Sequence, residues 1–339
     1  MTADKHASVG VLYTGGTFGM RPSARGYEPS TDLPARVDAA LAGEDLPLIN
    51  WLDPDAGPPV GSSDITPEFW YRLAATIRRN ADNHDGFVII HGTDTLAYTG
   101  AALSFLLAGL ERPVVITGAR APLGEPGSDA LDNFRGALAA ATCRRHPEVT
   151  VAFNGLLLRA NRSSKRYGTP QHLFSSPHWP ALAAFDHNGL RWAADLHAPD
   201  WPTAPTASFR ADARIVLLPA YPGMDAQTVR ALLDTGAGAL ILEGYPSGIG
   251  PGSDPDFVQA LADADSAGVL LLGISQGQYG TVRMGQYATS TPLAEAGLLS
   301  GADLTREAAL TKLHYLLCCD VDAATRKDLL RRSLCGELS

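Results

Sequence analysis

The sequence predicts an α/β fold built as two domains. With 339 residues, the chain is longer than one small hydrophobic core usually holds, so two domains are the default expectation. In both halves, short apolar runs alternate with helical patterns, which is the order of a parallel sheet with crossover helices. A hydrophobic content of 45% and a charged content of 19% are ordinary for a globular protein.

The first predicted strand, Val9–Tyr13, is apolar or glycine throughout and ends in the sequence T-G-G-T. Gly15 and Gly16 allow a sharp turn and a close approach of backbone N–H groups to a ligand. Thr14 and Thr17 place a hydroxyl on each side of this turn, at the strand end where open α/β sheets bind ligands. A tight turn between two strands is the alternative interpretation.

Residues 18–29 follow this turn and predict a hairpin or flap. Gly19 and Gly26 lie near its two ends and would let it move, and Tyr27 is its one large aromatic residue. An ordinary surface hairpin, in which Tyr27 packs on its neighbours, is the alternative.

The following elements complete the pattern expected of a parallel sheet. Thr66 and Pro67 are typical of a helix N-cap and first helical residue. The predicted elements after that helix are a strand at 86–90, a helix at 96–108, a strand at 113–117 and a helix at 131–144. Asn154-Gly155 then predicts a type I′ hairpin, which ends in the loop N-R-S-S-K at 161–165.

From about 174 to 211 the periodicity dissolves, and scattered tryptophans stand among Pro, Ala, His and Asp. We interpret this stretch as a linker between domains. Beyond it, strands are predicted at 215–218, 239–242 and 269–272, and helices at 226–233, 256–264, 305–319 and 323–334. The predicted organisation is therefore a first domain at 1–190, a linker at 191–212 and a smaller second domain at 213–339.

Charge and cysteine content limit the function classes. The net charge of −9 argues against nucleic acid or an anionic membrane as a partner. None of the four cysteines forms a C-x-x-C pair, which argues against a zinc site and for reduced thiols. The N-terminal apolar run is too short for a signal peptide, so we expect a cytoplasmic protein.

Polar side chains follow four predicted strand or hairpin ends, and we expect them to meet at one crevice. They are Thr14 with Thr17, Ser62 with Ser63 and Asp64, Thr93 with Asp94, and Lys165. A threonine hydroxyl becomes a nucleophile when a base takes its proton, and a lysine with a lowered pKa is such a base. Asp94 would orient that lysine or bind a substrate ammonium. Backbone N–H groups beside Gly15, Gly16 and Gly92 would stabilise an oxyanion.

Together these motifs resemble the bacterial L-asparaginase family over essentially the whole chain. The matching segments are Y-T-G-G-T-F-G-M, S-S-D-I-T-P-E, H-G-T-D-T-L-A-Y-T, N-R-S-S-K and L-T-K-L-H-Y-L-L. The last segment is similar to the cytoplasmic type I branch. The resemblance implies a large N-terminal flavodoxin-like domain, a smaller C-terminal domain, and a homodimer or homotetramer with active sites between subunits.

The resemblance also implies a mechanism without metal or cofactor. In it, Thr14 is the nucleophile, Tyr27 the flap tyrosine, Thr93 the residue that places water, Lys165 the base and Asp94 the acid. The substrate is L-asparagine, whose side-chain amide is cleaved to give aspartate and ammonia. Whether Tyr27 or Lys165 takes the proton from Thr14 stays open.

The same resemblance implies a set of substrate-binding residues. Ser62 and Ser63 match the residues that hold the α-carboxylate, and Asp94 also takes the α-ammonium. The remaining members of the substrate-binding set are Gly15, Thr17 and Thr93.

Three positions depart from the family pattern. Glu243 stands where type I members have arginine and Gly277 where they have cysteine, and both belong to the effector pocket of allosteric members. The allosteric site is therefore not expected here. Ile249 stands where the family has an asparagine that completes the substrate site, which motivates an amidohydrolase that prefers glutamine or another amide.

Two further alternatives follow from the sequence. The segment G-I-S-Q-G at 273–277 fits a serine-hydrolase nucleophile elbow, but the residues after it do not begin a helix, as an elbow requires. An amino-acid-binding protein that has lost catalysis is the non-enzymatic alternative. The glycines of the T-G-G-T turn fit neither a dinucleotide-binding motif nor a P-loop.

Overall fold

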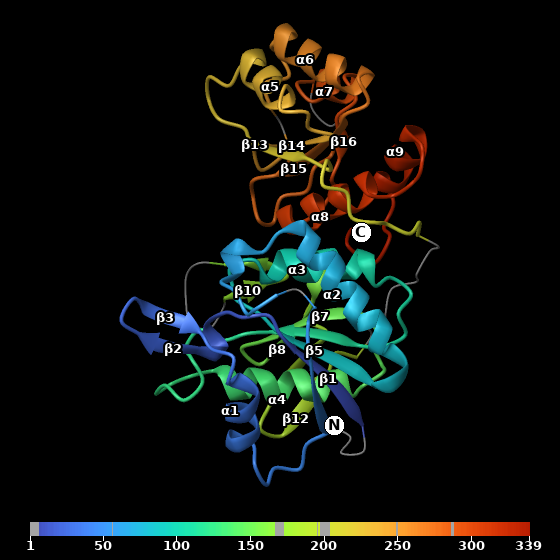
Figure 1. Ribbon diagram of the computed structural model, residues 1–339. Coiled ribbons are helices and arrows are strands. Elements are labelled where there is room, and N and C mark those ends of the chain that lie inside the picture. Colours follow the sequence, from blue (N-terminus) through green and yellow to red (C-terminus); the bar gives the residue numbers. More distant parts are fainter. Residues whose placement is uncertain are drawn as a thin grey trace. The chain divides into compact units, whose positions relative to one another are not determined.

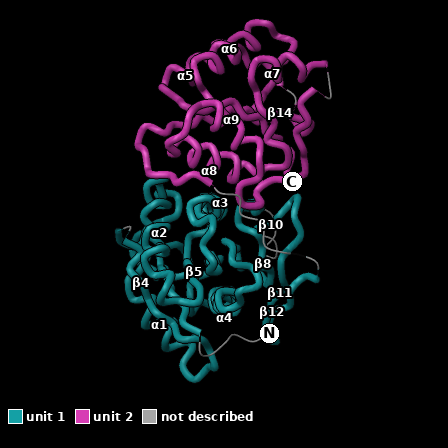
Figure 2. The backbone as a smooth tube through the Cα atoms, turned by 90° about the vertical axis from the view of Figure 1, so that its right-hand side faces the viewer, with its two compact units in different colours: residues 1–200 teal, residues 201–339 magenta. Residues whose placement is uncertain are grey.

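The computed structural model describes residues 7–55, 57–166, 173–194, 196, 204–248, 250–285 and 288–339. The chain divides into two compact units, residues 1–200 and residues 201–339 (Figure 2). A larger and a smaller α/β unit confirm the predicted two-domain architecture. None of the described helices has the length and apolar character needed to cross a membrane.

An eight-stranded sheet forms the centre of the first unit, in the order β12-β11-β8-β7-β6-β5-β1-β4. The strands are β1 (Ser8–Tyr13), β4 (Leu48–Leu52), β5 (Gly86–Ile90), β6 (Val114–Thr117), β7 (Val149–Phe153), β8 (Leu156–Arg159), β11 (Ala183–Asp186) and β12 (Gly189–Trp192). The neighbouring strands from β4 through β1, β5 and β6 to β7 are parallel. The pairs β7–β8, β8–β11 and β11–β12 are antiparallel. The parallel sheet expected from the sequence is therefore the part from β4 to β7.

Helices cover both faces of this sheet, which is why its central strands are apolar on both sides. They are α1 (Leu33–Ala40), α2 (Pro67–Asn80), α3 (Leu96–Leu106) and α4 (Ala130–Ala141). Figure 1 shows α2 and α3 on one face, and α1 and α4 on the other. Alternate residues of β1, such as Val9 and Val11, belong to the core cluster that includes Phe134 of α4.

Several predicted elements are confirmed with nearly the predicted bounds. Strand β5 covers 86–90, α3 begins at Leu96, and α2 begins at Pro67 with Thr66 at the N-cap position. The turn Asn154-Gly155 has positive φ at both residues, as a type I′ hairpin requires. Strand β4 and helix α1 lie where the sequence analysis assigned no element.

The interpretation of residues 174–211 as a linker is wrong for its first part. Strand β10 (Phe174–Ser175) pairs with β9 (Ser164–Lys165), and β11 and β12 form an antiparallel hairpin at the sheet edge. These strands are two to four residues long, too short to give a period. Tertiary packing stabilises the β11–β12 hairpin, because Leu182, Phe185 and Leu190 are buried in the core.

The second unit is a four-stranded parallel sheet in the order β13-β14-β15-β16. The strands are β13 (Ile215–Pro219), β14 (Ala239–Gly244), β15 (Leu270–Ser275) and β16 (Leu299–Ser300). The helices are α5 (Ala226–Leu233), α6 (Pro255–Ser266), α7 (Thr291–Glu295), α8 (Arg306–Leu317) and α9 (Ala323–Arg331). Helices α5 to α7 lie on one face of the sheet and α8 lies on the other (Figure 1).

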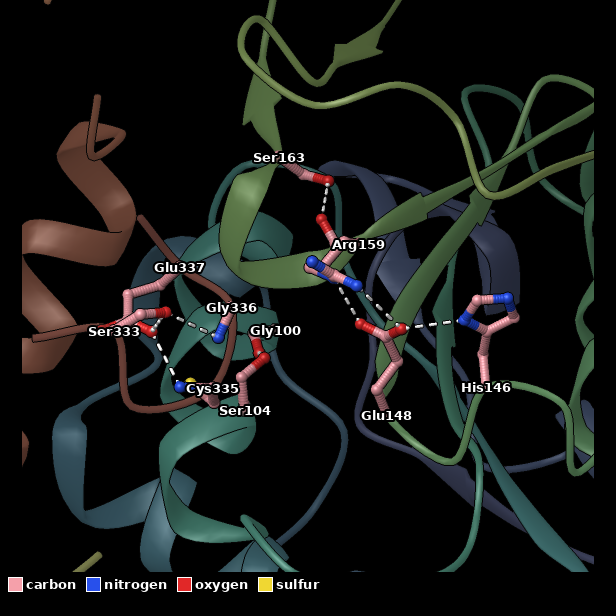
Figure 3. A network of polar contacts seen from close by, with 10 residues as sticks. All are labelled: Gly100, Ser104, His146, Glu148, Arg159, Ser163, Ser333, Cys335, Gly336 and Glu337. Carbon is pink, nitrogen blue, oxygen red and sulfur yellow. Dashed lines mark hydrogen bonds and ion pairs between the residues drawn. The ribbon is translucent and has the colours of Figure 1, made fainter. Parts of the chain in front are cut away.

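A buried ion pair anchors the C-terminal segment of the second unit. The Lys312 ammonium lies 2.7 Å from the Glu337 carboxylate, and both side chains are fully buried. Glu337 also accepts hydrogen bonds from the N–H groups of Leu334 and Cys335. Figure 3 shows the contact with Cys335. Burial alone would raise the pKa of Glu337, but Lys312 and these N–H groups hold it below its usual value.

Replacing this lysine is expected to destabilise the protein strongly. Lys312→Met leaves a buried carboxylate without its counter-ion, and the free energy of unfolding should fall by about 3–5 kcal/mol. Urea unfolding at neutral pH measures the change. The matched control is Lys327→Met, because Lys327 pairs with Asp265 at 2.5 Å while each side chain is about a quarter exposed. That pair should contribute at most about 1 kcal/mol, and an equal loss in both variants would contradict the argument.

Candidate active site

Thr14 continues strand β1 by one residue at the carboxyl end of the sheet. Its backbone N–H and its hydroxyl both donate to the carbonyl of Ile90, each at 3.0 Å. The residue is only 2% exposed. The last residue of β5 therefore fixes the orientation of the Thr14 hydroxyl.

The two glycines after Thr14 allow the backbone of three loops to pack closely. Gly15 and Gly16 have φ values of 121° and 83°, which side-chain-bearing residues rarely adopt. A Cβ on Gly15 would lie 2.0 Å from the carbonyl oxygen of Val60. A Cβ on Gly16 would lie 2.2 Å from the Cα of Gly92. The T-G-G-T turn thus lies directly against the H-G-T-D-T loop.

Ser62 joins the same site from the 3-10 turn η2 (Ser62–Asp64). Its hydroxyl accepts a hydrogen bond from the Asp94 N–H at 3.2 Å, and its carbonyl accepts one from the Thr95 hydroxyl at 2.7 Å. Ser62 is buried and its neighbour Ser63 is exposed. The structure therefore brings Ser62 into contact with the H-G-T-D-T loop, and it leaves Ser63 exposed beside it.

Lys165 on β9 brings a cation to the H-G-T-D-T loop. Its ammonium donates to the Thr93 hydroxyl at 2.9 Å and to the Asp94 carboxylate at 2.7 Å. The Lys165 side chain is 11% exposed, whereas the Asp94 side chain is 60% exposed. The structure thus joins three of the predicted site residues in one hydrogen-bonded group, in which the Asp94 side chain is the exposed member.

A buried cluster supports the segment that carries Lys165. The Arg159 guanidinium donates to the Glu148 carboxylate at 2.6 Å, and His146 Nδ1 lies 3.1 Å from the same carboxylate (Figure 3). The Ser163 hydroxyl donates to the Arg159 carbonyl at 2.7 Å, which fixes the turn before Lys165. The ring of Trp179 lies 4.6 Å from the Arg159 guanidinium carbon. Sequence reasoning missed this cluster, because its members are spread over 34 residues (146–179) with no local pattern.

The predicted flap is an antiparallel hairpin of β2 (Met20–Ser23) and β3 (Gly26–Pro29). It follows the 3-10 turn η1 (Thr17–Gly19), in which Thr17 is partly buried. Tyr27 on β3 is 51% exposed, and its hydroxyl makes no hydrogen bond with the described residues. The structure therefore places Tyr27 on the hairpin without bringing it into the hydrogen-bonded group. Arg36 holds the hairpin base by donating to the Gly19 carbonyl at 3.1 Å.

The departures from the family pattern lie in the second unit. The buried Glu243 carboxylate accepts two hydrogen bonds from the Arg306 guanidinium, at 2.5 and 2.8 Å. Gly277 follows β15, and its N–H donates to the Ser275 hydroxyl at 3.0 Å. Ile249 lies outside the described residues. Glu243 is thus a paired carboxylate at the end of β14.

The serine-hydrolase alternative requires Ser275 to stand at a strand-to-helix turn. After β15 the described chain forms turns, and the next helix begins at Thr291. The Ser275 hydroxyl donates to the Pro246 carbonyl at 3.0 Å. The G-I-S-Q-G segment therefore lacks the geometry of a nucleophile elbow.

The candidate site thus lies at the carboxyl ends of the parallel strands β1 and β5 of an α/β domain. Two family models match the chain, "Asparaginase, N-terminal" over residues 8–197 and "Glutaminase/Asparaginase C-terminal domain" over residues 214–330. The chain belongs to the asparaginase family.

Individual relatives and solved structures agree with this assignment. The chain is 38% identical to L-asparaginase 1 of Escherichia coli K12, over 98% of both sequences. It superimposes on the crystal structure of L-asparaginase I from Vibrio cholerae with a TM-score of 0.88, at 34% identity over 98% of this chain and 99% of that chain. The thermostable L-asparaginase of Thermococcus kodakarensis gives a TM-score of 0.85, at 29% identity over 98% and 99% of the two chains.

Proposed function

We propose that this protein hydrolyses L-asparagine to L-aspartate and ammonia through an acyl-enzyme on Thr14. The observation that carries the proposal is the hydrogen-bonded group of Thr93, Asp94 and Lys165, packed through Gly92 against the turn that carries Thr14. Membership of the asparaginase family supports the same activity.

In the first step, the Thr14 oxygen attacks the carbon of the substrate side-chain amide. The Thr14 proton passes to Lys165 through Thr93, or to Tyr27 when the hairpin closes, and from there to the departing nitrogen. Backbone N–H groups of the two adjoining glycine loops stabilise the oxyanion. The C–N bond breaks, ammonia leaves, and the aspartyl group stays bound to Thr14 as an ester.

In the second step, water attacks the ester carbonyl. Thr93 places the water, and the Lys165 amine takes the proton of that water. The Asp94 carboxylate stabilises the Lys165 ammonium that forms. The Thr14 oxygen leaves with a proton and aspartate is released. The 2.9 Å contact between the Lys165 nitrogen and the Thr93 hydroxyl supports this role.

Substrate binding uses the exposed side of the same group. Ser62 and Ser63 hold the α-carboxylate, and the accessible Asp94 carboxylate holds the α-ammonium. The backbone of Gly15 and the hydroxyls of Thr17 and Thr93 complete the substrate-binding set.

The organisation of the molecule is proposed on the same basis. We propose an N-terminal domain at 1–190, extended to Trp192 so that it includes β12, a connection up to 212 and a C-terminal domain at 213–339. We also propose a homodimer or homotetramer. A cytoplasmic location is supported by four free cysteines, three of which are buried, since a reducing compartment keeps thiols free.

Ammonia release from a panel of amides tests the function. We expect release from L-asparagine to exceed release from L-glutamine and D-asparagine. Release only from another amide would keep the chemistry and move the specificity to the loop that contains Ile249. If no amide is hydrolysed while asparagine still raises the melting temperature, the protein is an amino-acid-binding protein and the enzymatic proposal is wrong.

A further inference from the structure

His91, the first residue after β5, is fully buried and has a hydrogen-bond partner on each ring nitrogen. Its Nδ1 lies 2.7 Å from the carbonyl oxygen of Gly92, the next residue. Its Nε2 lies 2.9 Å from the hydroxyl oxygen of Thr99 on α3, which in turn accepts a hydrogen bond from Trp70 Nε1 at 3.1 Å. The ring is thus fixed between the sheet and two helices.

These partners define the protonation of the ring. A carbonyl oxygen only accepts, so Nδ1 carries the proton that points at Gly92. Burial lowers the pKa of His91 to about 4, so the ring is neutral at neutral pH. Nε2 then accepts from the Thr99 hydroxyl, whose lone pair accepts from Trp70. Only the tautomer with the proton on Nδ1 gives every polar atom in this series of contacts a hydrogen-bond partner.

Fixing the Gly92 carbonyl also fixes the direction of the Thr93 N–H. The peptide group is planar and trans, so the carbonyl of Gly92 and the N–H of Thr93 point to opposite sides. Gly92 has no side chain that would otherwise restrict rotation of this peptide plane. Among the described residues, none accepts a hydrogen bond from the Thr93 N–H, whereas the neighbouring Asp94 N–H donates to Ser62.

We infer that His91 is a positioning residue, which holds the Gly92–Thr93 peptide so that the Thr93 N–H is available to the developing oxyanion of the substrate. This inference rests on the proposed amide hydrolysis. His91 does not touch the substrate, and it acts only through the Gly92 carbonyl. Its loss should therefore weaken stabilisation of the transition state, with little effect on the groups that bind the ground state.

Two substitutions separate the two ring contacts. His91→Asn places an amide N–H near the position of Nδ1 and keeps the donor to Gly92. His91→Gln places its amide near the position of Nε2, so it keeps a partner for Thr99 and loses the donor to Gly92. We expect kcat for L-asparagine to stay within about twofold in His91→Asn and to fall about three- to tenfold in His91→Gln, with KM unchanged in both.

The matched control is His84, which flanks the other end of β5. It is also buried, and its Nδ1 lies 2.9 Å from a backbone carbonyl, that of Asn80. His84→Asn and His84→Gln should lower the melting temperature by amounts similar to those of the His91 variants, with kcat unchanged. Melting curves of all four variants identify loss of folded protein.

The outcomes distinguish this inference from the function on which it rests. An active wild type with equal kcat in His91→Gln and His84→Gln would overturn the positioning role alone. So would an equal loss in His91→Asn and His91→Gln, because only one of them lacks the donor. A wild type that hydrolyses no amide would overturn the proposed function, and the inference with it.

Discussion

Thr14→Ala is expected to lower kcat for L-asparagine by about 10⁴-fold or more, since it removes the nucleophile on which the acyl-enzyme forms. The variant should still bind asparagine, because the proposed contacts to the substrate α-groups come from other residues. The loss of folding stability should be small by comparison, because the substitution removes one hydrogen bond, from the Thr14 hydroxyl to the Ile90 carbonyl at 3.0 Å. That contact contributes about 1 kcal/mol. Ammonia release and the asparagine-dependent melting temperature measure the two effects.

Thr117 provides the matched control for this substitution. It ends strand β6, which lies on the far side of β5 from β1, is fully buried, and donates its hydroxyl to the Ala152 carbonyl at 2.8 Å. Thr117→Ala removes the same group in a similar environment, and it keeps the backbone hydrogen bond from the His91 N–H to the Thr117 carbonyl. If the two variants lose activity to the same extent, the loss comes from folding, and the nucleophile assignment of Thr14 is wrong.

Much of the fold and several of the predicted site residues were accessible from the sequence because their signals are local. Strand β5 is a continuous apolar run, and the H-G-T-D-T loop follows it directly. The prediction that Thr93, Asp94 and Lys165 would meet came from the rule that parallel strands share one carboxyl edge. Lys165 does contact Thr93 and Asp94, at 2.9 and 2.7 Å, but from β9, a strand of the separate antiparallel pair β9–β10, so the rule does not account for its position.

What the sequence analysis missed depends on tertiary partners. The hairpin of β11 and β12 contains strands of four residues each, and it is stable only because it adds to the edge of β8. The Glu148–Arg159 pair requires residues at the two ends of a hairpin to face each other inside the core. In the sequence, His91 is only one residue of the H-G-T-D-T motif. Its proposed positioning role follows only from its contacts with Gly92 and Thr99.

Lys165→Met should lower kcat by about 10²–10⁴-fold, the range expected when a general base is lost. The methionine fills a similar volume but leaves Asp94 without its cationic partner. Asp94 is 60% exposed, so water replaces the lost contact and the cost in folding stability should not exceed about 1 kcal/mol. The prediction is therefore a large kinetic loss in a protein that melts near the wild-type temperature. Parallel measurements of ammonia release and thermal unfolding test it.

The comparison with Lys327→Met separates catalysis from a general effect of removing a lysine–aspartate pair. Lys327 contacts Asp265 at 2.5 Å in the second unit, outside the proposed site, and should keep full activity when replaced. Lys165→Arg adds a second distinction, because arginine keeps the positive charge and a donor to Asp94 but does not release a proton at neutral pH. If Lys165 acts as a base, the arginine variant should be nearly as inactive as the methionine variant. Substantial activity in Lys165→Arg would mean that the cation only orients Thr93 and Asp94, and the proton from Thr14 would then have to pass to Tyr27.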